Sequence, residues 1–219
     1  MQESVQVFGE NSIELMPIFF VLADGNLELG KRKRAEAFLV GAHWTLMKHQ
    51  PSVTETNKEV EVPQEVLAGL RSRLHRSFGR LYTAAGNYQD ALKELTQNIY
   101  LESLDKGPEH QSLAGSYYLM GNIFAQDSRQ EEALSFYQQV SEVWKKFLED
   151  YGEEPSAVQI DKVELEEACE VLRKIIDFVY ELRGEESEAG AEIRKVLDEL
   201  FEFINKKEKE AYKMSRDEE

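Results

Sequence analysis

The sequence predicts an all-α fold built from repeated helical hairpins, and three observations support this prediction. Gly121 and Ala133 are small residues inside two predicted helices that flank a turn, with the aromatic residues Tyr117, Phe124 and Tyr137 around them. The same arrangement recurs twice earlier in the chain. The 219 residues include only 5 Pro and 13 Gly, while 42% are hydrophobic, which is enough to build a core. Because glycine inside a helix costs about 1 kcal/mol relative to alanine, we interpret Gly121 as a point of close helix crossing.

The first copy of this arrangement lies at residues 16–49. Ala23 and Ala35 occupy its two small positions, and Gly30 occupies its turn. It departs from the other copies at Asn26, where they carry an aromatic residue. We therefore expect one hairpin here, with its helices meeting at the two alanines.

The segment that follows, residues 50–66, lacks a helical period. It reads QPSVTETNKEVEVPQEV and contains two prolines. Proline and polar residues without periodicity predict a connection, and insertions of this kind are tolerated in helical arrays. We interpret the segment as an insertion loop between the first and second copies. A specific binding loop is the alternative.

The second and third copies, residues 72–105 and 114–144, match each other closely. Gly79, Gly86 and Ala91 of the second copy correspond to Gly121, Ser128 and Ala133 of the third. A small residue, an aromatic residue, a turn and a second small residue in this order are typical of the tetratricopeptide repeat (TPR). The sequence therefore predicts a TPR-like array of three repeats over residues 1–151.

The remainder of the chain is predicted to close this array. Apolar residues recur at helical spacing over residues 156–183, then GEESEAG forms a turn, and a second helix runs to about residue 212. Terminal units of an array need a polar outer face. We therefore expect residues 152–212 to form a pair of capping helices, followed by a frayed acidic tail at residues 213–219.

The charge of the chain excludes several kinds of partner. With 42 acidic and 26 basic residues, the formal net charge is −16, which argues against binding to nucleic acid or to anionic lipid. The most apolar run, IELMPIFFVLA, is too short to cross a bilayer. The single cysteine, Cys169, permits no intramolecular disulfide and no thiolate zinc site, which suits a reducing, cytoplasmic location.

No motif of a catalytic or cofactor site is found in the sequence. The four histidines are scattered, and there is no HExxH, no GxSxG, no phosphate-binding loop and no dinucleotide fingerprint. An enzyme with a helical accessory domain would need a catalytic segment of this kind. We therefore expect no catalysis, no metal, no cofactor and no small-molecule substrate.

The first helix of each repeat is expected to line the concave wall of the array. Arg73, Arg76 and Arg80 are spaced i, i+3 and i+7, so they form one stripe of one helix. The full set of residues predicted to form a partner-binding groove is Asp24, Arg73, Arg76, Arg80, Tyr118, Asn122 and Gln126.

Two interpretations of this stripe are open. Arginine binds carboxylates through two parallel hydrogen bonds, and an asparagine side chain can pair with a peptide backbone. The groove could therefore hold an acidic segment of a partner protein. Alternatively, the arginines pair with acids of the chain itself, for instance those of the C-terminal helices.

Three stretches resemble a more specific family: LHRSFGRLYTAAGNYQDALKELTQNIYLES, GSYYLMGNIFAQDSRQEEALSFYQQVSEVWKKFL and SIELMPIFFVLADGNLELGKRKRAEAFLVGAHWTLMK. Together they resemble the TPR region of axonemal MYND-type zinc-finger proteins, over about residues 8–148. The cysteines and histidines of such a finger would precede the first repeat and are not found in this chain, so the resemblance implies no metal. In a more general way, the long repeats are similar to the TPRs of kinesin light chains.

The resemblance implies a non-catalytic scaffold subunit associated with single-headed inner-arm dyneins of cilia and flagella. The partners that it implies are the tail of a dynein heavy chain, another TPR protein and proteins of the doublet microtubule. The location that it implies is the axoneme. The alternative is a cytoplasmic TPR adaptor that binds an acidic peptide segment of a cargo or signalling partner.

Overall fold

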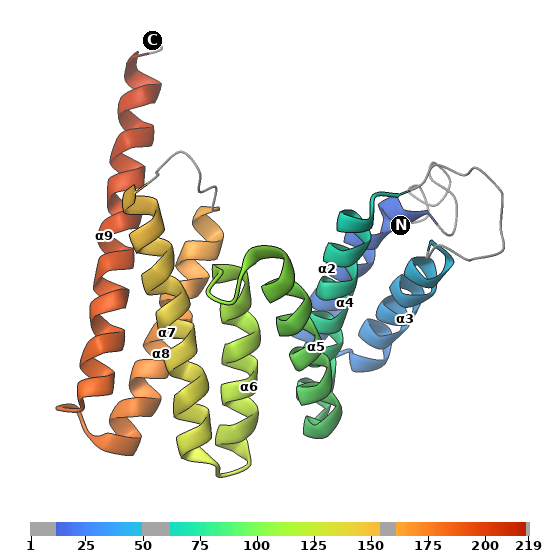
Figure 1. The fold of residues 1–219 in the computed structure, drawn as a ribbon, viewed down its shortest axis with the longest axis horizontal. Coiled ribbons are helices and arrows are strands. Elements are labelled where there is room, and N and C mark those ends of the chain that lie inside the picture. The colour runs from blue at the N-terminus through green and yellow to red at the C-terminus, as the bar shows by residue number, and fades with distance from the viewer. Residues whose placement is uncertain (1–11, 50–61, 154–160, 218–219) are drawn as a thin grey trace. The chain divides into compact units, whose positions relative to one another are not determined.

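The computed structural model describes residues 12–49, 62–153 and 161–217, and every regular element in these ranges is helical (Figure 1). The chain divides into two compact units, residues 1–108 and 109–219. The elements of the first unit are η1 (Ile13–Leu15), α2 (Met16–Glu28), α3 (Arg32–Lys48), α4 (Gln64–Ala85) and α5 (Tyr88–Lys106). Those of the second unit are η2 (Gln111–Leu113), α6 (Ala114–Gln126), α7 (Gln130–Glu153), α8 (Lys162–Arg183) and α9 (Glu188–Asp217).

The helices pair into hairpins where the sequence predicts them. The predicted repeats become α2–α3, α4–α5 and α6–α7, and the capping pair becomes α8–α9. The turn after α4 is made by Gly86 with φ +77°, and the turn after α6 contains Ser128 with φ +60°. Left-handed backbone of this kind favours glycine, so Ser128 adopts it at a cost that Gly86 avoids. The fold is therefore all-α and TPR-like, as predicted.

The division between the two units falls between residues 108 and 109 of the chain, whereas the sequence predicted a division after residue 151. The difference arises because the third hairpin shares its core with α8 and α9. Tyr137 meets Phe178 edge-on, with 5.1 Å between ring centroids. Phe147 and Tyr151 meet Phe203 in the same way, at 5.7 and 4.5 Å. The capping pair is thus part of the same compact unit as the third repeat.

Three further boundaries differ from the sequence analysis. Residues 50–61 of the expected loop lie outside the described residues, but 64–66 belong to α4, which begins after Pro63. Residues 188–190 of the expected turn belong to α9, where Ser187 Oγ accepts a hydrogen bond from the backbone N–H of Gly190 (3.1 Å) and so caps the helix. The helix α9 also continues to Asp217, into the segment expected to fray, because no glycine or proline follows Gly190.

A glycine faces a large side chain in each of the four hairpins. A Cβ built on Gly121 would lie 2.4 Å from Tyr137, and one on Gly79 would lie 2.6 Å from Leu95. In the other two hairpins the glycine is in the second helix. A Cβ built on Gly41 would lie 3.2 Å from Phe19, and one built on Gly190 would lie 2.5 Å from Tyr180. The interpretation of Gly121 as a close helix crossing is therefore confirmed.

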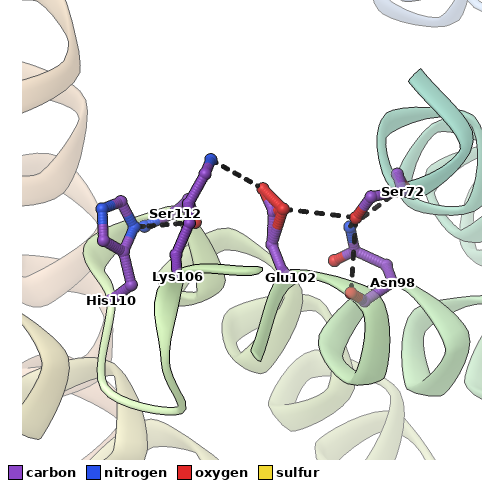
Figure 2. Close-up of polar contacts among 6 residues, drawn as sticks. All are labelled: Ser72, Asn98, Glu102, Lys106, His110 and Ser112. Atoms are coloured by element: carbon purple, nitrogen blue, oxygen red, sulfur yellow. Dashed lines mark hydrogen bonds and ion pairs between the residues drawn. The ribbon is translucent and has the colours of Figure 1, made fainter. Parts of the chain in front are cut away.

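A buried polar contact fixes the register of α4 against α5 (Figure 2). The side-chain amide of Asn98 donates to the backbone carbonyl (3.0 Å) and hydroxyl (2.9 Å) of Ser72. The Ser72 hydroxyl also lies 3.3 Å from the carboxylate of Glu102, which accepts from Lys106 at 3.1 Å. Because a buried polar group without a partner costs about 1–3 kcal/mol, this contact favours one alignment of the two helices. That alignment determines which side chains α4 presents on its surface.

Candidate functional site

The seven residues of the predicted groove belong to two different units. Asp24, Arg73, Arg76 and Arg80 lie on α2 and α4 of the first unit. Tyr118, Asn122 and Gln126 lie on α6 of the second.

Arg80 is engaged by acidic residues of the neighbouring hairpin. Its Nη1 donates to Asp24 Oδ1 at 2.6 Å, and its Nη2 donates to Glu28 Oε1 at 3.0 Å. Because Asp24 and Glu28 lie one turn apart on α2, a single guanidinium can reach both. For Arg80, the structure thus shows the alternative in which the arginine pairs with acids of the chain itself.

Arg73 has a different environment. Its guanidinium carbon lies 4.8 Å from the ring centroid of Phe20, a fully buried residue of α2. The side chain of Arg73 is exposed, and no acidic partner for it is found among the described residues. A guanidinium stacked on a ring keeps its edge N–H groups available for a carboxylate. Arg76, one turn further along α4, is half-buried.

The ion pair of Arg80 is expected to contribute little to stability. The side chains of Arg80 and Asp24 are 33% and 32% exposed, so solvent screens their attraction. In a double-mutant cycle of Arg80→Ala and Asp24→Ala, we expect a coupling energy below about 1 kcal/mol. Urea unfolding of the four proteins measures it. A coupling energy of about 2 kcal/mol or more would show that this pair is a main support of the hairpin contact.

On α6, two of the three predicted residues, Tyr118 and Asn122, contact Tyr137 of α7. The Tyr137 hydroxyl donates to Asn122 Oδ1 at 2.8 Å, and the ring of Tyr118 lies 6.0 Å from that of Tyr137. Gln126 is exposed at the end of the helix. Asn122 therefore holds a core tyrosine, a role that the sequence analysis did not foresee when it assigned Asn122 to a peptide backbone.

This arrangement predicts a dependence of stability on alkaline pH. Burial, followed by the proximity of Tyr118, raises the pKa of Tyr137 from 10.0 to about 12. Between these values the unfolded chain releases a proton that the folded chain keeps. The contribution of Tyr137 is therefore complete below pH 10 and is lost as pH rises toward 12, by at most about 1.4 kcal/mol per pH unit.

Tyr137→Phe is the matched control for this prediction. Urea unfolding at pH 9 and pH 11 should show a smaller loss of stability in Tyr137→Phe than in the unchanged chain, because only the latter carries the buried phenol. Equal losses in both proteins would mean that Tyr137 ionises as easily in the folded state as in the unfolded state.

The sequence analysis missed a second surface of the first unit, a pocket of about 380 Å³ between α3, α4 and α5. Val40 and Met47, which line it, are exposed, and so is Trp44, one turn after Val40 on α3. Their spacing of i, i+4 and i+7 was visible in the sequence. It was a second apolar stripe, separate from the one that buries Ala35 and Leu39 in the core.

Other kinds of site receive no support from the described part of the chain. Within residues 12–49, 62–153 and 161–217, His, Cys, Asp and Glu side chains do not gather in groups of three that could hold a metal ion. No described helix combines the length and the apolar character that crossing a bilayer requires.

Comparison with known proteins finds a family model that matches part of this chain. Residues 70–146 match the family model of the tetratricopeptide repeat. This range covers most of α4, all of α5 and α6, and most of α7, and it includes Gly79 and Gly121, the two close-packed glycines that lie in the first helix of a hairpin. The region is therefore a TPR region, and TPR repeats generally bind protein partners.

Two solved structures are similar over most of their length. One is of nearly identical TPR-like repeats assigned to a kinesin light chain of Podosopora anserina, with 17% identity, 93% of this chain and 92% of that chain covered, and a TM-score of 0.40. The other is a single-substitution variant of the same protein, with 16% identity, coverages of 94% and 92%, and a TM-score of 0.39.

Proposed function

We propose that this chain is a non-catalytic scaffold subunit of a ciliary axonemal inner-arm dynein complex, where it helps to tether or stabilise the dynein tail at the doublet microtubule. The observation that carries the proposal is the match of residues 70–146 to the tetratricopeptide repeat. Regions of this kind generally bind other proteins. The specific assembly is supported by the resemblance of the three quoted stretches to TPR regions of axonemal proteins.

Fractionation of cilia tests this proposal. After detergent removes the membrane and the soluble contents, we expect the chain to stay with the axonemes and to be released together with inner-arm dyneins at high salt. Complete extraction with the detergent-soluble fraction would overturn the axonemal assignment. It would leave the cytoplasmic adaptor as the function to test.

The alternative function is a cytoplasmic adaptor that binds an acidic peptide segment of a cargo or signalling partner. The observation in its favour is Arg73, because its stacked guanidinium is exposed and carries no acidic partner among the residues the structure describes. Arg80 is a poorer candidate, since two carboxylates already occupy it.

A charge reversal distinguishes capture by Arg73 from a general effect of charge. For any partner recovered with the chain, Arg73→Glu should weaken binding by about tenfold or more if the segment is acidic. Lys93 is an exposed residue of α5. Lys93→Glu changes the net charge by the same amount and should leave binding unchanged. Equal effects of the two substitutions would rule out a specific role of Arg73.

A further inference from the structure

A second binding surface lies on the side of α4 that faces away from the arginine stripe. At about 100° per residue, Arg71, His75, Phe78 and Tyr82 fall on the opposite side of α4 from Arg73, Arg76 and Arg80. These four residues line the 380 Å³ pocket together with residues of α3 and with Glu94 of α5. The surface is therefore separate from the one considered for the proposed function.

Apolar side chains line much of the pocket, and α3 carries exposed apolar side chains on the same side. Leu74 and Phe78 of α4 and Leu46 of α3 line it. On α3, Val40 is 42%, Trp44 is 62% and Met47 is 47% exposed, in one stripe along the pocket or beside it. An exposed tryptophan beside an apolar groove is typical of the residues that dominate binding energy at protein interfaces.

The two ends of the groove differ in charge. At one end, Tyr82 lies among carboxylates, and burial, followed by the nearby Glu94, Asp90 and Glu36, raises its pKa. Glu94 is held by His75, whose Nδ1 is 2.6 Å from its carboxylate. At the other end is Arg71. No ion pair joins Arg71 or Glu36 to a residue within 12–49, 62–153 or 161–217.

The spacing of these ends sets the length of a complementary segment. Arg71 and Tyr82 are separated along α4 by a rise of about 16 Å, which equals about three turns of helix. A helix places apolar residues on one face at i, i+3, i+4 and i+7, as binding in a groove requires. Helices also favour acidic residues near the N-terminus and basic residues near the C-terminus. The charges of such a helix would be complementary to Arg71 at its N-terminal end and to Glu36 at its C-terminal end.

We propose that the groove formed by α3, α4 and α5 binds an amphipathic helix of a partner protein, which lies parallel to α4 with its apolar face on Trp44, Met47 and Phe78. An acidic residue in its first turn faces Arg71. A basic residue in its last turn faces Glu36. This surface would let the chain hold a second protein while the arginine stripe is occupied.

Selection from a peptide library tests the proposal on the full chain. The library displays peptides of about 14 residues with a fixed helical apolar stripe and random residues at both ends. Selection uses the unchanged chain, with an excess of Trp44→Ala as competitor. We expect the recovered peptides to carry acidic residues at the N-terminal end and basic residues at the C-terminal end.

Binding of a recovered, dye-labelled peptide is then measured by fluorescence anisotropy. Trp44→Ala should weaken it by about tenfold or more, as expected for a dominant interface residue. Glu36→Lys should weaken the binding of peptides with a basic C-terminal end and should not change the binding of peptides in which that end is neutral. Leu104→Ala is the control, because Leu104 is 68% exposed on α5 and does not line the pocket. Circular dichroism verifies that each variant is folded.

Three results would overturn the proposal. The first is that the unchanged chain selects no peptide, or only peptides that bind Trp44→Ala equally well. The second is that the recovered peptides show no charge preference at either end. The third is that the unchanged chain forms a dimer that Trp44→Ala dissolves, because the surface would then hold a second copy of the chain.

Discussion

A chain that ends at residue 151 is expected to lose the folded state of its third hairpin. The buried face of α7 includes Tyr137, Trp144 and Phe147, and α8 and α9 cover part of it through Phe178 and Phe203. Exposing a large apolar side chain costs about 1.5–3 kcal/mol, so exposing several costs an amount comparable to the total stability of a typical domain, about 5–15 kcal/mol. We expect this fragment to aggregate, with Trp144 fluorescing as a solvent-exposed residue.

Division at residue 108 is the matched comparison. The fragments 1–108 and 109–219 each keep an apolar core of their own, so both should unfold cooperatively in urea. Trp144 is only 3% exposed, and its emission should be blue-shifted in the fragment 109–219. Cooperative unfolding of 1–151 with a buried Trp144 would contradict the boundary and would support a division after the third repeat.

Substitution of Gly121 is expected to have the second largest effect. The Cβ of any other residue would lie 2.4 Å from Cε1 of Tyr137. That ring cannot move easily, because it is buried and packs on Phe178, and because its hydroxyl donates to Asn122 Oδ1. Gly121→Leu should therefore destabilise the second unit by about 3 kcal/mol, the upper end of overpacking effects. Urea unfolding followed by Trp144 emission measures this loss.

The same substitution at another helical glycine, Gly69→Leu, is expected to increase stability. Gly69 lies inside α4, and a Cβ there would meet nothing within 4 Å. This variant should be stabilised by a few tenths of a kcal/mol up to about 1 kcal/mol, because leucine favours the helix more than glycine does. In a Tyr137→Ala background, Gly121→Leu should cost less than it does in the unchanged chain, since the two substitutions share one space. A loss at Gly121 that Tyr137→Ala does not reduce would contradict the close crossing as its cause.

The hairpins could be predicted from the sequence because their signals are local. Small residues at fixed spacing and glycine in turns identify the three hairpins of α2 to α7, although α4 begins before and α7 ends after the predicted copies. Gly41 and Gly190 could not be predicted from the pattern of Gly79 and Gly121, in which the glycine lies in the first helix of the pair. In the hairpins of Gly41 and Gly190 it is in the second, and the large partner is in the first. The pattern therefore indicates a close helix crossing but does not determine which of the two helices carries the glycine.

The division of the chain and the contacts of the candidate site could not be predicted in the same way. The pairing of Phe147 with Phe203 joins residues far apart in the sequence, and no repeat pattern indicates it. Arg80 and Asp24 were both expected on the concave wall, but whether they bind a partner or each other depends on distances between helices. The structure brings them within 2.6 Å.

Cross-linking of isolated axonemes, followed by mass spectrometry, tests the proposed scaffold role most directly. The account predicts that lysines of this chain, including the exposed Lys93, form cross-links with the tail of an inner-arm dynein heavy chain or with a second TPR protein beside it. Cross-links to neither, in axonemes whose dynein tails are otherwise well linked to their known neighbours, would contradict the account.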